Sequence, residues 1–306
     1  MATALRNLES RLRSSVRIAS GLNPAAKVLY VSSTHAAAGT GKPFTNPDNP
    51  ASTIDAAINA AAAGDVIVVA EGHVETIADS TSLVPDVAGI SIIGMGRGAR
   101  RPTITLSATG SNIPISAANV RMENFLFTTT GVVDVTAGIT VTAADVELYD
   151  IEYRESGTTS QVVDFIVGGT GAARLTVDGL RYLGTAGDAG AAAVSITGSV
   201  DGVIVSNFNI DGTLSAGGVE TVTGTITNIV VGPGIGRNRH STQDGSVVLA
   251  ASTTGHVFDV YARSATNDAD GFNLVYVGAG AQFFNCLAVN LDGEKGGSPL
   301  TASAAA

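Results

Sequence analysis

The chain has 306 residues and is 44% hydrophobic, which suits one elongated domain or two globular ones. Its net charge of −10 argues against nucleic-acid binding by the bulk surface, and its single cysteine excludes an intrachain disulfide framework. No apolar stretch approaches the roughly 20 residues of a membrane-spanning helix, so we expect no membrane contact.

The first 26 residues are basic, and we expect them to form a helical arm. Leucines recur at heptad spacing over residues 1–22, and Gly21 and Pro24 end the helix. Six basic residues against Glu9 alone give residues 1–47 a net charge of +5, which leaves −15 for the rest of the chain. A basic arm therefore precedes an acidic body.

Three roles for this arm are open. It packs back on the body as a cap, joins two partner helices in a trimeric bundle, or docks on an acidic partner surface in a larger assembly. In the last case the partner-binding residues are Arg6, Arg11, Arg13 and Arg17.

Residues 27–63 read as a first strand followed by a capping helix. The strand is KVLYVSST (27–34), and a GTGKPF turn follows it. Residues 52–61 fit an amphipathic helix that Ser52 or Thr53 caps. Its apolar face is Ile54, Ala57, Ile58 and Ala61.

A slipped alternation then recurs along the chain. In VRMENFLF (120–127) Val120 and Met122 point to one side, and the apolar side restarts out of phase after Asn124. A left-handed residue turns a strand through a corner in this way, and Gly, Asn and Asp tolerate that conformation best. The corner residues predicted by the pattern are Gly94, Asn124, Asp150, Gly179, Asn207, Asp259 and Asn285.

The spacing of these corners predicts a solenoid. From Gly94 to Asn207 the steps are 30, 26, 29 and 28 residues, and each repeat carries a second apolar strand upstream. A missing copy falls at Pro233, where the corner has to bend differently or shift to Gly232 or Gly234. Such a period with several short strands indicates stacked parallel coils, about 4.8 Å apart.

With this repeat, the chain resembles the right-handed parallel β-helix of the pectin-lyase-like superfamily over residues 64–293. The resemblance implies an all-β solenoid of about eight to nine coils. We expect the arm at 1–26, the first strand and capping helix at 27–63, the β-helix at 64–293 and a tail at 294–306.

The superfamily includes pectate lyases, which use calcium held by carboxylates, and polygalacturonases, which use an Asp cluster. The weak catalytic candidates here are Asp244 and Asp270, which are 26 residues apart. Stacking would place their carboxylates roughly 5 Å apart, suited to a shared cation or a carboxylate pair. We favour the alternative, a repeated Asp-Gly corner without a ligand.

Other motifs point away from catalysis. No helix is expected after GMGRGARRP (94–102), so it reads as an exposed connection rather than a phosphate loop. The four histidines lack metal-ligand spacing, so we expect no metal and no cofactor. Aromatic residues are scarce, which argues against a sugar-binding groove, and Tyr153 and Tyr182 point inward by the repeat.

The resemblance extends to bacteriophage head-decoration, fibre and spike proteins, which implies a structural role in a virion and a homotrimer. We expect a decoration or cement protein, made in the host cytoplasm, whose arm binds the major capsid protein or another virion protein. The alternatives are a tail fibre or tailspike component, or a polysaccharide lyase or hydrolase. A surface adhesin would need an export signal, and none is visible.

Overall fold

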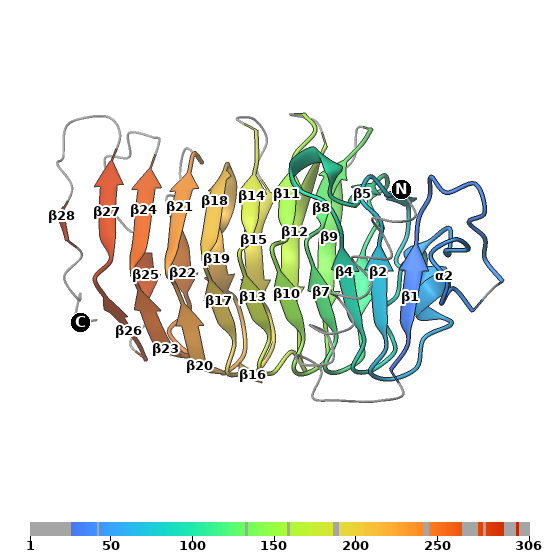
Figure 1. Ribbon diagram of the computed structural model, residues 1–306. Helices are drawn as coiled ribbons and strands as arrows, with labels where there is room; N and C mark the ends of the chain where they lie inside the picture. The colour runs from blue at the N-terminus through green and yellow to red at the C-terminus, as the bar shows by residue number, and fades with distance from the viewer. Residues whose placement is uncertain are drawn as a thin grey trace.

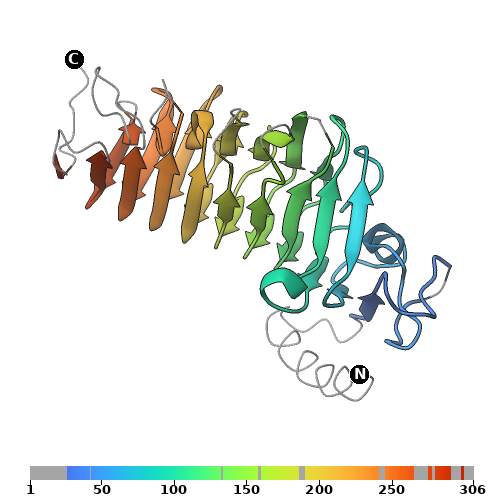
Figure 2. The same ribbon diagram turned by 90° about the horizontal axis from the view of Figure 1, so that it is seen from above.

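The computed structural model describes residues 26–41, 43–131, 134–157, 160–185, 190–240, 245–264, 275–277, 280–290 and 298–299. Within these ranges the chain is an all-β parallel β-helix, as predicted, and its coils stack in chain order (Figure 1). Figure 2 shows the same stack from above, with the blue first strand at one end and the red last strands at the other. Residues 1–25 of the expected arm lie outside the described residues.

Three parallel sheets form the walls of the solenoid. The first sheet contains β1 (Val28–Val31), β2 (Val66–Val69), β4 (Ser91–Gly94), β7 (Arg121–Glu123), β10 (Glu147–Tyr149), β13 (Thr176–Asp178), β17 (Ile204–Ser206), β20 (Ile226–Val231), β23 (Thr253–Phe258) and β26 (Ala281–Phe284), with β16 (Val200–Asp201) beside β20. The second contains β3 (Val74–Ile77), β5 (Thr103–Leu106), β8 (Leu126–Thr129), β11 (Glu152–Arg154), β14 (Arg181–Leu183), β18 (Phe208–Gly212), β21 (Gly234–Asn238), β24 (Val260–Ser264), β27 (Leu287–Asn290) and β28 (Ser298–Pro299). The third contains β6 (Ile113–Ile115), β9 (Asp134–Val141), β12 (Gln161–Gly168), β15 (Gly190–Ile196), β19 (Leu214–Thr221), β22 (Val247–Leu249) and β25 (Val275–Val277).

Every described pairing between these strands is parallel except that of β28 with β27. The third sheet has 7 strands, so seven coils carry a strand in all three walls. The remaining coils lack a described third-sheet strand.

The core consists of rows of buried side chains that run along the stack, and each coil contributes one residue to a row. Met122, Leu148 and Val177 pair in register along the first sheet, and all three are fully buried. Their neighbours on either side point outward, because side chains alternate along a strand. Stacked burial of this kind is the main stabilising term in a solenoid.

Four buried aromatic side chains, Phe127, Tyr153, Phe165 and Tyr182, pack against one another inside the stack. Tyr153 lies 4.9 Å from Tyr182 and 5.0 Å from Phe165 between ring centroids. Both tyrosines point inward, as the repeat predicts, and burial raises the pKa of each phenol. The backbone N–H of Val162 donates to the Tyr153 hydroxyl at 3.2 Å, which satisfies this polar atom inside the core.

The corners between the first and second sheets are left-handed. Six residues at predicted corners have positive φ: Asn124 (64°), Asp150 (49°), Gly179 (76°), Asn207 (51°), Asp259 (50°) and Asn285 (49°). At the irregular coil the left-handed residue is Gly232, with φ of 119°, rather than Pro233. Only glycine fits there, since a Cβ would lie 1.8 Å from the carbonyl oxygen of Phe258.

Gly94 is a correction to the predicted corners. It does not have a positive φ and ends strand β4, and the chain adopts positive φ at Gly96 instead. Close packing explains the glycine at position 94, because a Cβ there would lie 2.4 Å from the carbonyl oxygen of Asn124. Glycine at position 94 is therefore needed for close packing, whereas at the other corners glycine supplies a positive φ.

A second row of left-handed residues precedes the first sheet and was not predicted. From Gly89 to Gly202, the backbone N–H of each residue in this row donates a hydrogen bond to the next coil. The acceptor is the carbonyl of the residue that precedes the next member of the row. The Asn119 N–H, for example, donates to the Ala144 carbonyl at 3.1 Å. From Gly64 to Gly202 each of these residues precedes a first-sheet strand, whereas Asn228 lies within β20. The row is Gly64, Gly89, Asn119, Asp145, Arg174, Gly202 and Asn228.

The capping helix α2 spans Ile54–Ile58 and is shorter than the predicted 52–61. Thr53 is its N-cap, and its hydroxyl accepts from the Ala56 backbone N–H at 3.2 Å. The buried Glu75 carboxylate accepts from the Ile54 backbone N–H at 3.0 Å, which ties the helix to β3. No helix among the described residues is long and apolar enough to cross a membrane.

We expect Asn124→Val to lower the free energy of unfolding by about 1–3 kcal/mol, because a β-branched residue is strained at positive φ. The change also removes the Asn124 amide bonds to the carbonyls of Gly94 (2.8 Å) and Gly96 (3.1 Å). Chemical denaturation measures the effect. Asn124→Gly is the matched control, since it loses those bonds without the strain, and equal stability of the two variants would contradict the role of strain.

Candidate functional site

A cavity of about 290 Å³ lies at the corner between the first and second sheets. The connection that contains η1 (Gly98–Arg100) forms one side, and β11 and β14 form the other. Its volume is near the lower limit for small-molecule sites. The lining residues are Arg97, Gly98, Arg101, Asn124, Asp150, Ile151, Glu152, Gly179 and Arg181.

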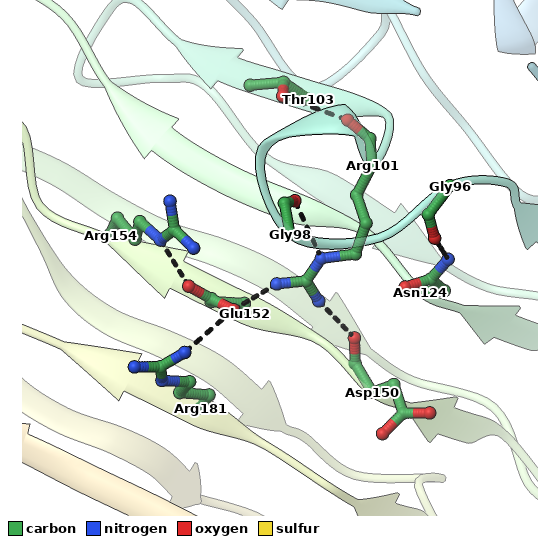
Figure 3. A network of polar contacts seen from close by, with 9 residues as sticks. All are labelled: Gly96, Gly98, Arg101, Thr103, Asn124, Asp150, Glu152, Arg154 and Arg181. Carbon is green, nitrogen blue, oxygen red and sulfur yellow. Dashed lines mark hydrogen bonds and ion pairs between the residues drawn. The ribbon is translucent and has the colours of Figure 1, made fainter. Parts of the chain in front are cut away.

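Arg101 reaches from this connection across the stack (Figure 3). Its Nη1 donates to the Asp150 carbonyl at 3.2 Å and its Nε to the Gly98 carbonyl at 3.4 Å, while Nη2 pairs with Glu152. The segment was predicted to be exposed, and Arg97 is exposed, but Arg101 is only 9% exposed. Arg101 therefore ties the connection to a coil about 50 residues further along the chain.

Glu152 is the centre of this ion-pair cluster. Its side chain is only 4% exposed although it occupies an outward position of β11. Arg101 and Arg154 contact its carboxylate closely, and Arg181 lies 3.8 Å away (Figure 3). A buried carboxylate needs such compensation, since burying an unpaired charge is costly.

The other polar groups of the cavity also serve contacts within the chain. The Asn124 amide donates to the carbonyls of Gly94 and Gly96, and the Asp150 carbonyl accepts from Arg101. Asp150 itself is exposed and supplies the second carboxylate of the cavity. These contacts link coils of the stack to one another.

A second group of acidic residues lies on the third sheet and was missed in the sequence. Asp164 is on β12, Ser195 on β15 and Glu220 on β19, three successive strands. The Ser195 hydroxyl donates to the Glu220 carboxylate at 2.7 Å, while Asp164 Oδ1 is buried without a partner. The sequence carried no signal for this group, because Glu220 aligns in register with Ser195 and Val167, while Asp164 aligns with Ala192 and Gly217.

Burial changes the acidity of both carboxyl groups. It raises the pKa of Asp164, which a hydrogen bond from the Ala192 backbone N–H partly offsets. Burial also raises the pKa of Glu220, with a further contribution from the charge of Asp164, while the Ser195 bond acts in the opposite direction. Carboxyl groups with raised pKa are candidates for proton transfer, but structural groups share this property.

The residues predicted for catalysis and partner binding lie outside the described residues. These are Asp244 and Asp270, together with Arg6, Arg11, Arg13 and Arg17. Arg237 and Arg239, which precede Asp244 in the sequence, are described, and both form ion pairs with Asp211. Within the described ranges, no group of three or more His, Cys, Asp or Glu side chains is placed to hold a metal ion.

No family model matches the sequence, and no curated protein matches it. Among solved structures, sacteLam55A from Streptomyces sp. SirexAA-E is similar, with a TM-score of 0.55 and 15% identity over 78% of this chain and 47% of that one. A variant of sacteLam55A in complex with glucose gives a TM-score of 0.54 and 14% identity over 77% of this chain and 46% of that one. This chain therefore spans about half the length of these proteins, and the likeness is one of fold.

Arg101→Met should lower the free energy of unfolding by about 2 kcal/mol, because it leaves Glu152 buried with two remaining guanidinium groups. Thermal and chemical unfolding measure the loss. Arg100→Met is the matched control, since Arg100 pairs with Glu71 at the surface with side chains 73% and 43% exposed. The control should change stability by less than about 0.5 kcal/mol, and equal losses would contradict the bracing role of Arg101.

Glu220→Gln should stabilise the protein at about pH 8 and lose that advantage by about pH 3. The folded state holds the Glu220 proton more tightly than the unfolded state, so wild type loses stability as pH rises through the raised pKa. Glutamine keeps an acceptor for Ser195 and does not ionise. Unfolding midpoints across pH test this, with the half-exposed Glu147→Gln as control; a gain that is independent of pH would contradict it.

Proposed function

We propose that the protein is a structural component of a virus particle of the tailed-bacteriophage type. Its specific role is that of a head decoration or cement protein, which works as a homotrimer and attaches through its basic N-terminal arm. A tail fibre or tailspike component is the closest structural alternative. In each of these roles the solenoid acts mechanically, as a stiff body held on a larger assembly.

The observation that carries the proposal is the use of polar side chains as braces between coils. Arg101 and Glu152 join distant coils, and Arg174 bonds Asp145 of the preceding coil through two nitrogens at 2.6 and 2.7 Å. Asn207 donates to Asp178 at 2.6 Å in the same manner. Together with the parallel backbone pairing between successive coils, these contacts favour a stiff body.

The charge distribution supports attachment through the arm. The +5 charge of residues 1–47 contrasts with −15 in the rest, so the arm and the body suit different surfaces. Arg6, Arg11, Arg13 and Arg17 are the proposed contacts to an acidic capsid or other virion protein. The particle is accordingly the proposed location.

A carbohydrate-active β-helix is the second candidate, and two observations favour it. A protein of similar fold has been solved with glucose bound, and this chain carries carboxyl groups of raised pKa at Asp164 and Glu220. Product release from neutral glucans, or from acidic polysaccharides with calcium, tests it. Turnover that is lost in the Asp164→Asn, Glu220→Gln double variant or in the Asp244→Asn, Asp270→Asn double variant would support this candidate.

Light scattering of the full chain and of a chain that starts at Ala25 tests the structural proposal first. We expect trimers for both, because the solenoid makes the oligomer and the arm remains available for attachment. Monomers in both cases would overturn the trimer and favour the enzyme. A trimer that becomes monomeric on truncation would make the arm the oligomerisation device and remove its proposed anchoring role.

A further inference from the structure

Large apolar side chains are exposed on two of the three walls. Among the described residues, those exposed on the first sheet are Ile204 and Phe284, and those on the second are Val74, Ile235 and Leu287. None lies on a strand of the third sheet; the sixth, Val222, directly follows β19. These side chains belong to coils spread along the stack, and of the five on these two walls Phe284 and Leu287 are the pair that shares a coil.

The same two walls carry opposite charge. Outward positions of the first-sheet strands β7, β10 and β13 hold three carboxylates and one cation: Glu123, Glu147, Asp178 and Arg121. On the second sheet, outward positions of described strands from β11 to β24 hold four cations and two carboxylates: Arg154, Arg181, Arg237, Arg263, Glu152 and Asp211. These second-wall positions therefore carry a net charge of +2 in a chain whose total charge is −10, with Arg154, Arg181 and Arg237 also paired to carboxylates of their own wall.

Some outward residues of the two walls lie at the same height along the stack, because each coil contributes one strand to the first sheet and the next strand to the second. Asp178 ends β13 and Arg181 begins β14 of one coil. Phe284 ends β26 and Leu287 begins β27 of another, with side chains 53% and 38% exposed. Within one chain, the two residues of each pair face outward from different walls.

We infer that the protein forms a closed ring in which the second sheet of one copy packs against the first sheet of the next. Rotation about an axis parallel to the stack keeps every coil at its height. Asp178 then meets Arg181 of the next copy, and Phe284 meets its Leu287 across the contact. Such an interface joins two different surfaces and closes into a ring rather than a two-fold pair.

This inference rests on the proposed homotrimer and adds which faces make it. Opposite charges across an interface specify the partner and the register, and apolar groups supply most of the affinity. The third sheet then faces away from the contact. A second copy of this chain is the occupant that these pairs favour, since Asp178 and Arg181 carry opposite charges at one height and Phe284 and Leu287 are both exposed and apolar at another.

The test reverses charges at one height of the interface. Asp178→Arg and Arg181→Asp each place like charges across every contact, so each should weaken the trimer. A fivefold loss per contact, about that of one exposed ion pair, gives about a hundredfold loss over three contacts. The Asp178→Arg, Arg181→Asp double variant restores opposite charges and should recover most of the affinity. Concentration-dependent light scattering of the full chain measures both.

Asp134→Lys reverses an exposed charge on the third sheet and is the matched control. Circular dichroism and unfolding midpoints establish that each variant is folded. Wild-type trimers whose stability is unaffected by the Asp178 and Arg181 variants, or is weakened only by Asp134→Lys, would overturn the assignment of faces and leave the trimer in place. A wild-type monomer at all concentrations would overturn the trimer itself.

Discussion

The left-handed residues at the ends of the first-sheet strands are the constraint on which the rest of the fold depends. At such a residue the direction of the side chains reverses, so the strands on both sides of a corner turn their apolar residues inward. Because the conformation is accessible mainly to Gly, Asn and Asp, it can be repeated at every coil with little strain. Arg174 is the exception with φ of 57°, and its guanidinium pairs with Asp145 of the preceding coil.

The sequence predicted the corners where apolar residues flank them on both sides, as around Asn124 and Asp150. It failed at Gly94, because a glycine needed for close packing has the same letter as one needed for positive φ. The second row escaped notice because alanines surround it and because Arg174 does not suggest a left-handed residue. The local pattern of apolar residues therefore predicted the repeat and the corner after the first-sheet strands, but not the left-handed residues before them.

The polar clusters were beyond prediction for a different reason. Glu152 collects guanidinium groups from three positions up to 51 residues away, and all lie on outward positions where no periodicity constrains residue type. Asp164 and Glu220 lie on strands of the third sheet, where the sequence pattern singled out no polar residue. Their burial depends on how neighbouring coils pack, which only the assembled stack defines.

The last strand of the second sheet limits how this molecule can associate end to end. β28 runs antiparallel to β27, with Ala288 opposite Ser298 and Leu287 opposite Pro299. A strand in this direction interrupts the parallel template, and its proline lacks the backbone N–H that a further strand would use. Parallel pairing of a further strand on this edge of the second sheet is therefore disfavoured, which protects that edge from pairing with another molecule.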